Sequence, residues 1–161
     1  MSLLLILIMA CEEAASPIPI DAQIGTGEWE WSELEEGGDI PVIQGPQGGF
    51  HLLGSVRVSG IETGDADTLS ATNNPTTSFF VWVDGTNLTP GASYTQGLDS
   101  SSNLDDSYTH EMLGRFAILD IESDDELDGI ELLFEVVVED VNGTVVGDYL
   151  NLVAYPHPYN L

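Results

Sequence analysis

The chain has 161 residues, of which 42% are hydrophobic, and its 28 aspartates and glutamates against two arginines give a formal net charge of −26 at pH 7. We expect no nucleic-acid partner, because binding a phosphate backbone needs a basic surface that two arginines cannot form. The same charge repels anionic lipid surfaces, while the length and hydrophobic content suit one domain around a single core.

The chain begins with an uninterrupted apolar run over residues 3–9. A transmembrane helix needs about 20 such residues, so the run is too short to span a bilayer and is typical of the apolar core of an export signal. Residues 8–11, Ile-Met-Ala-Cys, resemble the lipobox of bacterial lipoproteins. The resemblance implies that residues 1–10 are a signal peptide and that Cys11 becomes the lipid-carrying N-terminus. The alternative is a buried strand with a free thiol, which the acidic pair Glu12 and Glu13 disfavours.

Residues 11–27 are predicted to form a flexible, acidic tether, since they contain Glu12, Glu13 and two prolines. In bacterial lipoproteins the residue after the lipidated cysteine affects sorting between the two membranes of Gram-negative cells. Glu12 is not the usual inner-membrane retention residue, so the resemblance implies attachment to the outer membrane rather than the inner one. Since Cys11 is the only cysteine, no disulfide is expected.

Hydrophobic alternation with a period of two recurs along the rest of the chain and predicts β-strands. In residues 28–32 it places Trp29 and Trp31 on one face, and residues 79–83 are apolar on both faces, as in a central strand. The pair Asn142-Gly143 predicts a hairpin with a type I′ turn. The predicted strands cover residues 28–32, 50–59, 79–83, 92–95, 114–121, 130–139 and 144–155.

Seven short strands with polar loops between them predict an all-β domain over residues 28–161. We expect an antiparallel two-sheet sandwich of immunoglobulin-like architecture. The Cys…Trp…Cys pattern of antibody domains is absent, so the comparison concerns architecture alone.

A glycine-rich segment precedes the second predicted strand. Residues 45–51, Gly-Pro-Gln-Gly-Gly-Phe-His, together with residues 55–60, resemble a segment of uncharacterised acidic lipoproteins of myxobacteria and their relatives. The resemblance implies an exported, lipid-anchored β domain and carries no activity. No Lys-Ser/Thr pair follows the glycines, so we expect a tight turn here rather than a phosphate-binding loop.

Acidic residues gather between the predicted strands 114–121 and 130–139. Residues 124–129 with Glu135 nearly fit the calcium loop of an EF-hand, but that motif needs a helix on each side, and both flanks alternate as strands. A looser calcium site remains open, because Ca²⁺ takes several oxygen ligands on a flexible loop. Its candidate ligands are Asp120, Glu122, Asp124 and Asp128; the alternative is a solvated acidic turn.

A second candidate metal site would use soft ligands. Imidazole and thioether donors suit transition metals such as copper, and the chain offers His51, His110, Met112 and His157 for this purpose. Their spacing does not itself indicate a site, and exposed histidines are the simpler interpretation.

No catalytic motif is recognisable, so we expect no enzyme and no cofactor other than a possible calcium ion. The sequence favours a lipid-anchored protein with a binding or structural role at the cell envelope, attached to the membrane through Cys11 and contacting an envelope partner of unknown identity. Two alternatives remain open: a small periplasmic transition-metal-binding protein, and an envelope hydrolase built on paired carboxylates.

Overall fold

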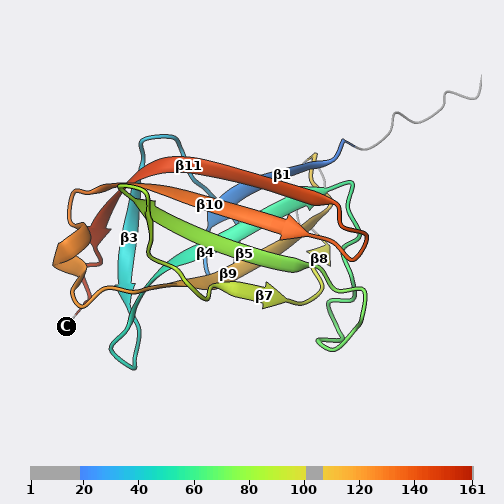
Figure 1. The fold of residues 1–161 in the computed structure, drawn as a ribbon, viewed down its shortest axis with the longest axis horizontal. Coiled ribbons are helices and arrows are strands. Elements are labelled where there is room, and N and C mark those ends of the chain that lie inside the picture. Colours follow the sequence, from blue (N-terminus) through green and yellow to red (C-terminus); the bar gives the residue numbers. More distant parts are fainter. Residues whose placement is uncertain (1–18, 101–106, 161) are drawn as a thin grey trace, which may run out of the picture.

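The protein is all-β, as predicted, in a computed structural model that describes residues 19–100 and 107–160 (Figure 1). These residues contain eleven strands rather than the seven expected, and one short 3₁₀ turn, η1 (Asp124–Leu127). The strands are β1 (Asp21–Thr26), β2 (Ser32–Glu33), β3 (Asp39–Gln44), β4 (Phe50–Ser59), β5 (Thr76–Val83), β6 (Thr86–Asn87), β7 (Ser93–Thr95), β8 (Asp99–Ser100), β9 (His110–Leu119), β10 (Glu131–Glu139) and β11 (Val145–Pro156).

Hydrogen bonds link all eleven strands of the described residues into one large mixed sheet, so the predicted two-sheet sandwich is not confirmed. One half of the sheet is built on β1, β4 and β9, and the other on β11, β10 and β5. Strand β3 joins them, because its first residues pair with β11 and its last two pair with β4. The β3–β11 pairing is parallel, which corrects the expectation of a purely antiparallel fold.

The hydrophobic core lies between the two halves. Gly54 on β4 faces β5, where a methyl group added to the glycine would lie 2.6 Å from ring carbons of Phe79. Phe79 in turn stacks on Phe134 of β10, with ring centroids 6.0 Å apart. Strand β10 buries Leu132, Phe134, Val136 and Val138, as the alternation over residues 130–139 predicts, whereas Ile130, expected inward with them, precedes the strand and is 38% exposed.

Two predictions near the N-terminus are wrong. Residues 21–26, expected in the tether, form β1, which pairs with β4 and buries Ala22 and Ile24. Residues 28–31, expected in a strand, form a bend, and Trp29 is almost fully exposed while Trp31 packs over Arg57. The positive φ of Gly27 (106°) turns the chain before the tryptophan pair can extend β1.

The hairpin at residues 140–144 forms as expected but with a different turn. Gly143 has a φ of 79°, but Asn142 does not have a positive φ, because Asp84 is the only non-glycine residue with one among the described residues. The turn is therefore not type I′, which requires positive φ at Asn142 as well. Its loop is held by the Asp140 carboxylate, which accepts hydrogen bonds from the backbone N–H groups of Asn142 and Thr144 at 2.8 Å each.

Candidate binding site

A groove with a volume of about 490 Å³ lies where the β3–β4 turn meets strand β9. We call it the His51 groove. Its walls are mainly apolar and come from the turn, from the start of β4 and from the last part of β9. The lining residues are Gly45, Pro46, Gln47, Gly49, Phe50, His51, Phe116 and Ile118.

The glycine-rich turn forms one wall, and it is the tight turn that the sequence predicts. Gly45 N–H donates to the carbonyl of Gly49 at 2.7 Å, and Gly48 N–H donates to the carbonyl of Gly45 at 2.9 Å. Gly48 adopts a φ of 88°, which favours glycine because a side chain would clash with the backbone. The turn therefore holds Pro46 and Gln47 beside the groove.

The opposite wall consists of two large apolar side chains that point outward from β9. Phe116 is 46% exposed and Ile118 is 59% exposed, although Ala117 and Leu119 between and beside them are buried. A β-bulge sets this orientation, because Gly54 pairs with Arg115 while Val56 pairs with Met112, leaving Ser55 opposite two residues of β9.

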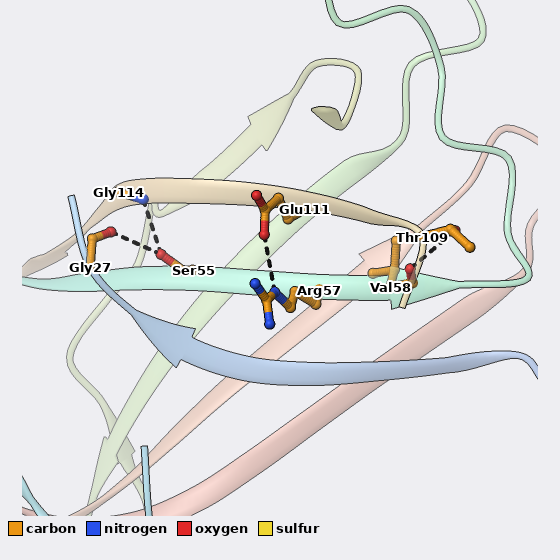
Figure 2. A network of polar contacts seen from close by, with 7 residues as sticks. All are labelled: Gly27, Ser55, Arg57, Val58, Thr109, Glu111 and Gly114. Atoms are coloured by element: carbon orange, nitrogen blue, oxygen red, sulfur yellow. Dashed lines mark hydrogen bonds and ion pairs between the residues drawn. The ribbon is translucent and has the colours of Figure 1, made fainter. Parts of the chain in front are cut away.

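The bulge depends on Gly114, which has a φ of 62° and lies against the carbonyl of Glu28, leaving no room for a side chain. Ser55 fixes the position: its hydroxyl accepts from the Gly114 N–H and donates to the Gly27 carbonyl, each at 3.1 Å (Figure 2). Because one extra residue reverses which face each side chain takes, Met112 points into the core while Phe116 and Ile118 point out.

His51 forms the floor of the groove. Its ring lies 4.3 Å from the Phe116 ring, measured between centroids, and the residue is only 8% exposed. Burial lowers the pKa of His51 below its usual value of 6.5, because the apolar walls disfavour the charged imidazolium. A neutral imidazole among apolar walls can donate a hydrogen bond to a bound group through one ring nitrogen or accept one from it through the other.

An acidic segment borders the groove, since Asp120 follows Leu119 directly and Leu119 pairs with Phe50. The segment is linked to the β3–β4 turn through Asn160, which donates to Asp124 Oδ2 at 2.6 Å and accepts from the Gln44 N–H at 2.8 Å. This border, residues 120–128, holds six carboxylates and no basic side chain.

The four candidate calcium ligands do not gather around one point. Within the described ranges, no group of three or more histidine, cysteine, aspartate or glutamate side chains is close enough to hold a metal ion. η1 instead uses its acids internally: Glu126 Oε1 accepts from the N–H groups of Glu122 and Ser123 at 2.8 and 2.9 Å. Asp124 is engaged with Asn160, while Asp120, Glu122 and Asp128 are exposed.

The candidate soft-metal ligands are also separated. His51 points outward into the groove, whereas Met112 points into the core from the opposite face of the same pair of strands. His110 contacts the Thr109 hydroxyl, and the His157 ring lies against the Tyr159 ring beyond the end of β11, with the two planes inclined by 55°. Where the chain is described, the fold therefore does not bring these four side chains into one shell.

Both arginines of the chain take part in contacts within the domain. Arg57 Nε donates to Glu111 Oε2 at 3.0 Å across β4 and β9 (Figure 2), and Trp31 covers the guanidinium with its ring centroid 4.4 Å away. Arg115 lies over the Tyr94 ring and donates to the Leu113 carbonyl. Because both arginines are engaged in these contacts, the acidic residues dominate the electrostatic potential of the surface.

The sequence pointed to the glycine-rich turn but not to Phe116 and Ile118 as groove walls. The sequence does not reveal their outward orientation, because Phe116 and Ile118 are larger apolar residues than Ala117 between them and hydrophobicity alone would place them on the buried face. Gly114 is an isolated glycine inside a strand pattern, which is a signal of a β-bulge. A bulge at this glycine changes which face the following side chains take, and it could have revealed that Phe116 and Ile118 point outward.

Comparisons of the chain with protein-family models, curated proteins and solved structures found no match. In residues 19–100 and 107–160, no helix has the length and apolar character needed to cross a membrane.

Proposed function

We propose that the protein is a lipid-anchored binding module of the cell envelope, attached through Cys11 to the outer membrane, with the His51 groove as its binding surface. The proposal combines the lipobox-like residues 8–11 with a groove that exposes Phe116 and Ile118 on an otherwise acidic molecule. Concave, mostly apolar sites with a few polar groups are the usual form of a binding site.

The observation that carries the proposal is the distance between the groove and the N-terminal end of the domain. Asp21, the first residue of β1, pairs with Ser59 at the end of β4, whereas the groove begins at Phe50 and His51 at the start of β4. Ten strand residues at roughly 3.3 Å each put about 30 Å between the two positions. A chain anchored at Cys11 would therefore carry the groove at the end of the domain that is farther from the anchor.

The partner we propose is a protein segment with an aromatic or aliphatic residue flanked by basic residues. The apolar walls suit the hydrophobic residue, and the acidic border at residues 120–128 attracts basic flanks. An anionic ligand is disfavoured by the net charge of −26.

Anchoring is tested by the Cys11→Ser variant of the full-length chain, expressed in a Gram-negative host and extracted into a phase-separating detergent. The wild type is expected in the detergent phase and in the outer-membrane fraction, and the variant in the aqueous phase. Equal partitioning of both proteins would contradict lipidation at Cys11.

Groove binding is tested with short synthetic peptides in which phenylalanine alternates with lysine, followed by NMR of the mature domain. Shift changes are expected at His51 and Ile118, and they should be lost in the Phe116→Ser/Ile118→Ser double variant. Leu69→Ser is the matched control, because Leu69 is an exposed apolar residue that does not line the groove. Shifts spread evenly over the surface, or equal loss in the control, would contradict a groove site.

A further inference from the structure

The outer face of the β5–β10–β11 sheet carries a second cluster of aromatic and polar side chains. We call it the Trp82 face. Cross-strand pairing puts Trp82 and Asn151 on either side of Leu133, and Phe80 and Tyr149 on either side of Glu135. The Phe80 and Trp82 rings are neighbours, with centroids 6.2 Å apart and planes inclined by 34°.

A carboxylate at the centre of this face is held in place by one of the aromatic rings. Trp82 Nε1 donates to Glu135 Oε2 at 3.0 Å, which orients both the indole and the carboxylate. Tyr149, which is 61% exposed, lies beside Glu135 on the other flank. The face therefore offers apolar rings and hydrogen-bonding groups side by side.

A shallow depression of about 550 Å³ extends the face at the end of β5. It is lined by Trp82, Asp84, Gly85, Glu131, Leu132, Leu133 and Asn151. The Asn151 side chain is fixed there by Glu36, whose Oε1 accepts from Asn151 Nδ2 at 2.7 Å. Pre-positioned amide and carboxylate groups lower the entropy that binding would otherwise cost.

The rings lie side by side on one face of the sheet, and the strand register does not place them around a common centre. Phe80 and Trp82 belong to β5 and Tyr149 to β11, two interstrand spacings or roughly 9–10 Å apart. A cation is best held by rings that surround it. A row of rings with carboxylates and amides between them instead matches an extended ligand that has flat apolar patches and many hydroxyl groups. Pyranose sugars have this chemistry, because their C–H faces stack on aromatic rings and their hydroxyls bond to carboxylates.

We propose that the Trp82 face is a binding site for a neutral oligosaccharide chain, independent of the His51 groove. Trp82 and Tyr149 would each stack under one sugar ring, and Glu135, Asn151 and Asp84 would accept hydrogen bonds from sugar hydroxyls. The net charge of −26 disfavours acidic polysaccharides, which would be repelled.

The test uses the mature domain and four neutral hexasaccharides: cellohexaose, maltohexaose, mannohexaose and chitohexaose. Binding is measured by calorimetry and by tryptophan fluorescence. At least one of the four is expected to bind, with affinity reduced about tenfold or more by Tyr149→Ala and by Trp82→Ala, because truncating an aromatic anchor removes most of its contact. Tyr149→Ala removes an exposed side chain and keeps the test valid if the half-buried Trp82 is needed for folding.

Trp29→Ala is the matched control, since Trp29 is strongly exposed and lies outside the Trp82 face. This variant should bind the sugar with the affinity of the wild type. Raising sodium chloride to molar concentration should leave the affinity unchanged, because the ligand is uncharged. A polylysine peptide serves as the charged comparison ligand. The proposal is overturned if none of the four sugars binds, if sugar binding survives both Tyr149→Ala and Trp82→Ala, or if only polylysine binds and salt abolishes that binding.

Discussion

Arg57 and Glu111 form an ion pair across β4 and β9, with Nε and Oε2 3.0 Å apart and side chains only 7% and 5% exposed. The pair lies on the outer face of the sheet, yet Trp31 covers the guanidinium from the bend after β1. Residues 28–31, which the sequence predicts to be part of a strand, thus shield a charged pair from water. Burial of such a pair makes the loss of either partner expensive, because the other charge is left without compensation.

The first prediction concerns this pair. Glu111→Gln and Arg57→Met should each lower the free energy of unfolding by about 3–5 kcal/mol, as measured by urea denaturation. The double variant Arg57→Met/Glu111→Leu should recover most of the loss, since two apolar side chains leave no buried charge. Single variants as stable as the wild type would show that the pair is not isolated from solvent.

The second prediction concerns the close approach of β4 and β5. Gly54→Ala should destabilise the fold by about 1–3 kcal/mol, the usual cost of overpacking a core, because the new methyl group would meet the Phe79 ring. Phe79→Leu combined with Gly54→Ala should cost less than the sum of the two single changes. Gly91→Ala, which meets nothing within 4 Å, is the control and should be nearly neutral in thermal melts.

Much of the fold was predictable where a strand has one buried and one exposed face. β10 is the clearest example, because its buried residues alternate without interruption. The sequence does not predict β3, because Pro41 interrupts the strand pattern, and the pairing of β3 with the distant β11 cannot be deduced from local sequence.

The candidate site was less predictable, since its geometry depends on contacts between distant segments. The outward orientation of Phe116 follows from a bulge that Ser55 and Gly27 stabilise, and Gly27 lies far away in the chain. The Trp82 face likewise needs the register of three strands before Tyr149 can be placed beside Glu135.

The third prediction concerns acid stability. Hydrogen bonds from the backbone N–H groups of Glu62, Thr144 and Asn142 outweigh the effect of burial and lower the pKa of Asp140 below its usual 3.8. The folded carboxylate therefore binds its proton less readily than the unfolded one, so its contribution to stability is complete above pH ~4 and is lost as the pH falls through the folded pKa.

Thermal melts of the wild type and Asp140→Asn between pH 7 and pH 2 test this. The stability difference between the two proteins should be largest at neutral pH and should shrink in acid. Glu139→Gln, which removes an exposed carboxylate from the same hairpin, controls for the general effect of net charge. A difference that stays constant with pH would contradict the role of the Asp140 carboxylate.

The fourth prediction concerns divalent cations. Because Glu126 and Asp124 are already engaged with N–H groups and with Asn160, calcium and magnesium at equal ionic strength should raise the melting temperature equally, by screening alone. Asp124→Asn with Asp128→Asn should leave both responses alike. A larger response to calcium that the double variant removes would instead establish a calcium site at residues 120–128.

The fifth prediction concerns the central claim, that the domain is anchored at Cys11 and presents the His51 groove away from the membrane. If Cys11 is acylated, a cysteine introduced by Gln47→Cys at the groove, or by Asn142→Cys near Asp140, is the only thiol that a fluorescent dye can label. Asp140 accepts a hydrogen bond from Glu62, which lies just beyond the Ser59 end of β4, so Asn142 marks the end of the domain where β1 begins.

The decisive measurement is energy transfer from each dye to acceptor lipids, with the lipidated protein inserted into zwitterionic liposomes. We expect weak transfer from position 47 and clearly stronger transfer from position 142, because the two ends of the domain differ by about 30 Å along β4. Equal transfer from both positions, stronger transfer from position 47, or failure of the wild-type protein to insert would contradict the account.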